Sequence, residues 1–226
     1  MIMFKSLYDA ISKNSLLDDS FKLIGKLCER TEEMFEIASE SFIENEEPEE
    51  DLFKMDKEVN SMVQDIRRKV LEYFSMTTAP NYFAGLVLIS LAVDYERIGD
   101  YTKKLYSLRE IFDYHDGING ELAHILRDMR HNIMIMFPEA FRFIEERNEK
   151  YPNNVTEHEK KVKRDYERLL ERIHDDEVSK EEALAVSKFA GRLVRIAGHL
   201  DNISSSSGRP FPKLGFKPGS ASWTDD

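Results

Sequence analysis

The chain contains few of the residues that mark secreted or nucleic-acid-binding proteins. Its 226 residues include one cysteine, one tryptophan and an excess of acidic over basic side chains, for a formal net charge of −11. The single thiol, Cys28, cannot form an internal disulfide or a thiolate metal cluster, so a reducing compartment is its natural setting. Cys28 lies in an amphipathic run, which predicts a buried, inert thiol. So acidic a chain also lacks the basic surface that binds nucleic-acid phosphates or an anionic membrane.

Long hydrophobic runs are absent as well. No segment of the sequence is long and apolar enough to cross a bilayer, and the opening residues, MIMFKSLYDAISKN, lack the apolar region of a signal peptide. We therefore expect a cytoplasmic protein without membrane insertion and without a nucleic-acid partner.

Apolar residues recur at helical spacing along most of the chain, whereas strand signals are nearly absent. The pattern predicts six helices, over about 18–45, 51–76, 81–112 and 120–150, with two more that begin near 156 and 179. Asp18 is the expected N-cap of the first helix. Thr156-x-x-Glu159 and Ser179-x-x-Glu182 are the expected capping boxes of the last two. From Ser204 onward the chain is rich in Gly, Pro and Ser without periodicity, which predicts a flexible tail.

The second half of the chain resembles the first at a period of about a hundred residues. Two segments show this best: DKEV at 56–59 matches EKKV at 159–162, and RIGDY at 97–101 aligns with RIAGH at 195–199. The repeat predicts an all-α fold of two tandem three-helix bundles, each burying apolar stripes between its helices. We expect the first bundle in residues 1–115, the second in 116–207 and the tail in 208–226.

The stretch DYERIGDYTKK at 94–104 places acidic residues and a glycine inside an expected helix. Glu96 and Asp100 are one turn apart on one face, where their side-chain roots lie about 5–6 Å apart and repel each other. A basic group, open water or a bound cation should compensate them. Gly99 costs about 1 kcal/mol relative to alanine in a helix interior, and it would let another backbone or a ligand come close.

This stretch, with the duplication, resembles the PhoU family of phosphate-uptake regulators over roughly residues 15–206. Family members carry a segment like ERIGDH on the last helix of each bundle and a D-x-x-(V/I)-D or -N pattern on the middle helix. The first half has ERIGDY at 96–101 and DKEVN at 56–60. The resemblance implies a PhoU-like fold and a metal site in the first repeat, with Asp56, Asn60, Glu96 and Asp100 as its ligands. Oxygen ligands of this kind suit a divalent or ferric ion, such as Mg, Mn, Ca, Zn or Fe.

The second half departs from this pattern. Val194 stands where Glu96 would be, Gly198 replaces Asp100, and Lys163 replaces Asn60. Only Glu159 remains of the four, so the sequence predicts metal binding in the first repeat alone.

The resemblance also implies a function. It predicts a cytoplasmic, non-enzymatic regulator of phosphate uptake, phosphate homeostasis and phosphate-starvation signalling. The implied partners are the ATPase subunit of the phosphate ABC transporter and the phosphate-responsive sensor histidine kinase, together with self-association as a homodimer.

Three alternatives remain open at this point. The first is a PhoU-like accessory protein of a low-affinity phosphate permease. The second is a carboxylate-bridged di-iron enzyme, which needs two E-x-x-H motifs in a bundle core, whereas this chain has one, Glu121 to His124. The third is a helical scaffold in which the Glu96 and Asp100 pair has no role.

Overall fold

The structure is a computed structural model that describes residues 2–111, 118, 120–145, 154–175, 178–206 and 214. These residues form seven helices and no strand: α1 (Ile2–Lys13), α2 (Ser15–Glu44), α3 (Leu52–Met76), α4 (Tyr82–Ile111), α5 (Gly120–Glu145), α6 (Val155–Asp175) and α7 (Lys180–Ser205). The expected bundle boundaries near 115 and 207, and nearly all of the expected tail, lie outside the described residues.

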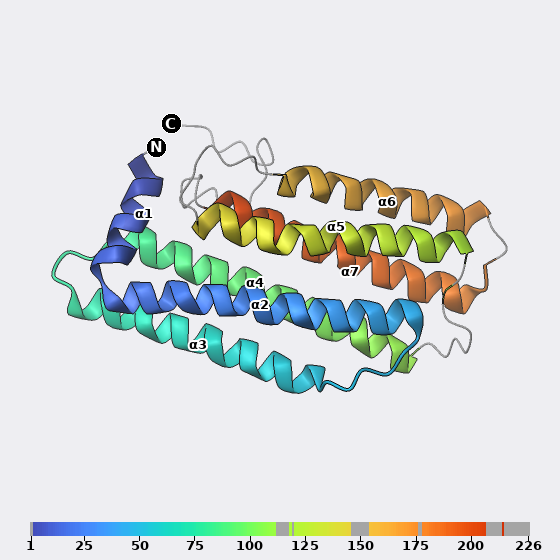
Figure 1. Cartoon of the computed structure of the whole chain (residues 1–226), viewed down its shortest axis with the longest axis horizontal. Helices are drawn as coiled ribbons and strands as arrows, with labels where there is room; N and C mark the ends of the chain where they lie inside the picture. Colours follow the sequence, from blue (N-terminus) through green and yellow to red (C-terminus); the bar gives the residue numbers. More distant parts are fainter. Residues whose placement is uncertain are drawn as a thin grey trace, which may run out of the picture.

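The helices form two bundles that pack side by side (Figure 1). In each bundle the three helices all contact one another: α2, α3 and α4 in the first, and α5, α6 and α7 in the second. The bundles meet where α4 packs on α7 and α2 packs on α5. The predicted all-α fold of two tandem three-helix bundles is confirmed.

Helix α4 is apolar on more than one face because it has neighbours on several sides. Val87, Leu88, Leu91 and Ala92 are all buried, and α4 packs against both helices of its own bundle and against α7. A helix enclosed in this way loses the single apolar stripe of a surface helix. None of the helices in the described ranges combines the length and apolar character that crossing a bilayer requires.

Aromatic rings join the two bundles. Phe42 on α2 stacks on Phe189 on α7, with ring centroids 4.0 Å apart and planes 9° apart. Phe35 and Phe137 make a second contact across the same interface, at 5.7 Å. Cys28 is buried as predicted, and its thiol donates a hydrogen bond to the carbonyl oxygen of Phe137, with Sγ and O 3.6 Å apart.

The beginning of the chain differs from the prediction. Helix α1 was not foreseen; in Figure 1 it is steeply inclined to α2 and ends beside the start of that helix, and it contacts both α2 and α4. It buries Leu7, Tyr8 and Ile11. The N-cap of α2 is Asn14, whose Oδ1 accepts hydrogen bonds from the amides of residues 16 and 17 at 3.0 and 3.4 Å. Asp18 as the N-cap was therefore wrong, and its carboxylate pairs with Lys22 instead, at 2.7 Å.

Of the two expected capping boxes, one cap is confirmed and the other is wrong. Ser179 precedes α7, and its Oγ accepts a hydrogen bond from the amide of Glu182 at 3.1 Å. Helix α6 begins at Val155, so Thr156 lies inside its first turn. The Thr156 hydroxyl donates to Asp201 on α7 at 2.7 Å, which makes it a link between helices instead of a cap.

Candidate functional site

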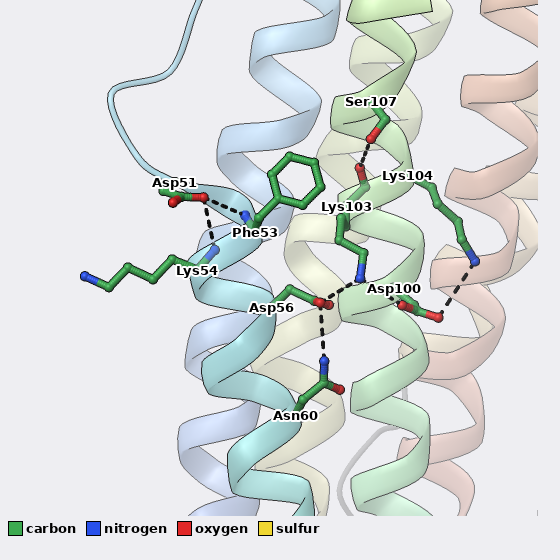
Figure 2. A network of polar contacts seen from close by, with 9 residues as sticks. All are labelled: Asp51, Phe53, Lys54, Asp56, Asn60, Asp100, Lys103, Lys104 and Ser107. Carbon is green, nitrogen blue, oxygen red and sulfur yellow. Dashed lines mark hydrogen bonds and ion pairs between the residues drawn. The ribbon is translucent and has the colours of Figure 1, made fainter.

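Helices α3 and α4 bring two of the predicted site residues together. Asp56 on α3 points toward α4, and the end of the Lys103 side chain lies between Asp56 and Asp100, as Figure 2 shows. The Asp56 side chain is 10% exposed and that of Asp100 is 28% exposed. We call Asp56, Asn60, Asp100 and Lys103 the α3/α4 patch.

The group between the two carboxylates is Lys103. Its Nζ lies 2.6 Å from Oδ2 of Asp56 and 3.3 Å from Oδ1 of Asp100. Partial burial alone would lower the pKa of Lys103. The hydrogen bonds and charges of Asp56 and Asp100 together outweigh that effect and raise its pKa above the ordinary value. The ammonium is therefore charged at neutral pH, and it ties α3 to α4.

The other two predicted residues do not offer oxygen atoms to this position. Asn60 donates its amide Nδ2–H to Oδ2 of Asp56 at 3.3 Å, so it serves Asp56 as a hydrogen-bond donor. Glu96 lies one turn before Asp100 on α4, and Arg97 contacts it with Nε and Oε2 3.6 Å apart. Asp100 has a second basic neighbour, Lys104, at 3.7 Å.

Basic side chains compensate the acidic residues of the stretch at 94–104. Two lysines of the same helix, Lys103 and Lys104, compensate Asp100, and Lys103 also reaches across to Asp56. The contact of Lys103 with both carboxylates was not predicted from the sequence. The spacing of three residues between Asp100 and Lys103 was the available signal, because residues at i and i+3 are neighbours on a helix surface.

The arrangement fits an ammonium better than a metal ion. A hard cation needs several oxygen ligands converging on one point. Here Asp56 and Asp100 converge, but Lys103 lies between them and Asn60 presents a donor. In the part of the chain that the structure describes, no group of three or more His, Cys, Asp or Glu residues is placed to hold a metal. A metal would have to displace Lys103, and metal binding by the four predicted residues stays a prediction.

In the second repeat, the carboxylate that corresponds to Asp56 is also paired with a lysine. Glu159 on α6 stands where Asp56 stands on α3, and its side chain is 4% exposed. Lys163, one turn further along α6, pairs with Glu159. Asp201 on α7 takes the place of Lys103 and accepts the hydrogen bond from Thr156.

The Glu121 and His124 motif lies on the surface. Glu121 accepts hydrogen bonds from Arg168 and Arg172, each at 2.6 Å, which holds its pKa below the ordinary value. The His124 side chain is 69% exposed, and its Nε2 lies 3.4 Å from Asp128. This motif does not enter the bundle core, where the di-iron hypothesis requires it.

The fold and the patch define a two-repeat, all-helical protein with a similar acidic position on the middle helix of each repeat. The PhoU domain model matches residues 24–108 and 126–206, that is, both bundles. The chain belongs to the PhoU family, whose members are regulators of phosphate transport rather than enzymes. Helix α1 lies outside both matched segments.

A solved structure supports the same fold. The chain resembles the crystal structure of PhoU from Pseudomonas aeruginosa with a TM-score of 0.71 and 19% sequence identity, over 86% of this chain and 96% of that one. Identity this low supports the fold alone. A search of curated protein sequences found no match.

Proposed function

We propose that this protein is a cytoplasmic, non-enzymatic adaptor that represses phosphate uptake and the phosphate-starvation response when phosphate is plentiful. The observation that carries the proposal is the match to the PhoU domain in both bundles, together with the paired three-helix packing of that fold. The partners we propose are the ATPase subunit of the phosphate ABC transporter and the phosphate-responsive sensor histidine kinase.

The proposal is tested first by deleting the gene. Phosphate uptake and a starvation-responsive reporter should both rise in phosphate-rich medium, and the plasmid-borne gene should restore them. Uptake and reporter activity that stay at the wild-type level after deletion would contradict the regulatory function.

Partner binding requires a second test. We expect the acidic pair on α4 to contribute, because Glu96 and Asp100 keep side chains that are 25% and 28% exposed. Glu96→Ala with Asp100→Ala should weaken binding to the purified ATPase subunit or to the cytoplasmic part of the kinase. The matched control is Glu167→Ala with Glu171→Ala, because these residues also lie one turn apart and are exposed, but on α6. Equal binding by both double variants would support the scaffold alternative, in which the Glu96 and Asp100 pair has no role.

One observation favours a second candidate function. Val194 and Gly198 replace the acidic residues of the ERIGDH-like segment in the second repeat, so the chain diverges from the family pattern. An accessory protein of a low-affinity phosphate permease would share the fold and have a different partner. The neighbouring genes distinguish these two functions: a permease gene would favour the accessory protein, and genes of an ABC transporter would favour the adaptor.

Self-association as a homodimer is tested by light scattering.

A further inference from the structure

The strongest feature outside the proposed function is the cation that the chain itself supplies to the α3/α4 patch. Lys103 is the only residue for which contacts to both Asp56 and Asp100 are described, at 2.6 and 3.3 Å. Asp56 sits in the seam between two helices with a side chain only 10% exposed. Removing a carboxylate from water costs several kcal/mol unless a partner compensates it, so Asp56 needs a permanent cation.

The second repeat provides an independent observation. Its buried middle-helix carboxylate, Glu159, also pairs with a lysine, but that lysine is Lys163 on the same helix. The first repeat has Asn60 at that place and draws its lysine from α4 instead. Each repeat therefore pairs its middle-helix carboxylate with a lysine, but the lysine comes from the neighbouring helix in the first repeat and from the same helix in the second.

We propose that the ammonium of Lys103 occupies the cation position between Asp56 and Asp100, so that the α3/α4 patch is closed by the chain itself and accepts a divalent ion only when that ammonium is removed. The family resemblance implies a metal at these residues, and the geometry in this chain disagrees with it. Because Lys103 is part of the chain, its ammonium links α3 to α4 at every metal concentration. This link therefore does not depend on metal supply and is not removed by chelators.

Lys103→Met is the direct test, because methionine keeps an unbranched apolar side chain and removes the ammonium group with its charge and its hydrogen bonds. Mn²⁺ binding to chelator-stripped protein is measured by calorimetry, and thermal unfolding is followed in EDTA and in Mn²⁺. The wild type should show the same unfolding temperature in both. The variant should unfold at a lower temperature in EDTA, recover in Mn²⁺, and bind Mn²⁺ at least about tenfold more tightly than the wild type.

Two controls separate a metal site from a lost ion pair. Adding Asp100→Asn to Lys103→Met removes a carboxylate and should abolish the gain in Mn²⁺ binding. Lys163→Met breaks the corresponding pair of the second repeat, where Val194 and Gly198 offer no side-chain oxygen. It should lower the unfolding temperature without recovery in Mn²⁺.

Several results would overturn the proposal. Wild-type protein that binds Mn²⁺ as tightly as Lys103→Met, or is purified with stoichiometric metal lost on Asp100→Asn substitution, would show that Lys103 does not exclude the ion. A folded Lys103→Met that gains no Mn²⁺ binding would show that Lys103 forms an ordinary ion pair and not a cation substitute. If Lys103→Met does not fold, Lys103→Gln replaces it, and the wild-type metal measurement still decides the first point.

Discussion

Two glycines of α4 should respond in opposite ways to the same substitution. A Cβ added at Gly99 would lie 3.5 Å from Cγ1 of Val59, 3.9 Å from Oδ1 of Asp56 and 4.0 Å from Cγ2 of Thr31, which are ordinary van der Waals distances. A Cβ added at Gly85 would lie 2.4 Å from the Phe74 ring and 2.8 Å from Cγ1 of Val70. The residue that permits close packing of α3 on α4 is therefore Gly85, and not the Gly99 of the acidic stretch.

The magnitudes follow from these distances. Gly99→Ala should stabilise the fold by about 1 kcal/mol, because alanine restricts the unfolded chain and favours helix. For a chain of this length that corresponds to a rise in melting temperature of about 2–4 °C. Gly85→Ala has the same favourable effect on helix propensity, but the new methyl group must push Phe74 or Val70 aside, which costs about 1–3 kcal/mol. The free energy of unfolding of Gly85→Ala should therefore be lower than that of the wild type by up to about 2 kcal/mol.

Both variants and the wild type are compared by urea unfolding monitored by circular dichroism. The second repeat supports the expectation for Gly99, since Ala197 takes its place in the aligned RIAGH segment and is buried. A Gly99→Ala protein less stable than the wild type would refute the reasoning, because it would show that something approaches this position more closely than Val59. A stabilising Gly85→Ala would show that α3 and α4 are not in close contact there.

Three further predictions concern the bundles and their contacts. Burial raises the pKa of the Cys28 thiol to about 12, so Ellman's reagent should modify it far more slowly in the native protein than in urea. Phe189→Ala removes the stacked ring between the bundles and should lower the free energy of unfolding by about 3–5 kcal/mol, whereas Leu184→Ala, at an exposed position, should change it by less than about 0.5 kcal/mol. Burial, and then the charge of Lys161, lower the pKa of His158 in the folded protein. The unfolded chain therefore binds a proton at His158 more readily than the folded chain does. Above the ordinary histidine pKa this difference costs no stability, and as the pH falls toward the lower pKa of the folded state the protein loses stability. Between about pH 7.5 and about pH 5, the free energy of unfolding measured in urea should therefore fall more for the wild type than for His158→Gln.

The sequence predicted those features that depend on neighbours along the chain. The expected helix at 51–76 is α3 at Leu52–Met76, because its apolar residues follow one helical face and Asp51 caps it. The Ser179 cap followed from the same kind of local signal. Helix α1 was missed because it is a short segment of 12 residues with no capping signal before it.

Thr156 shows where local signals fail. Its spacing from Glu159 matches a capping box, but its hydroxyl bonds to Asp201, which is 45 residues away in the sequence. Glu159 is likewise committed to Lys163. A pattern of four residues cannot reveal that a partner from another helix takes the hydroxyl, because that depends on how α6 and α7 pack.

The same limitation explains why the four predicted residues could be assigned to two adjacent helices, whereas the position of Lys103 between Asp56 and Asp100 could not be predicted. Each residue along a helix adds 1.5 Å of rise and about 100° of rotation. A shift of α4 against α3 by a single residue would therefore turn Lys103 away from Asp56, and Asp100 would change its position with it. The sequence determines which residues share a face of each helix, whereas the relative register depends on how the side chains between the helices pack, as Phe74 and Val70 do against Gly85. That register brings Lys103 to Asp56, so a Gly85 substitution that shifts α4 against α3 should also lengthen the contact between these two side chains.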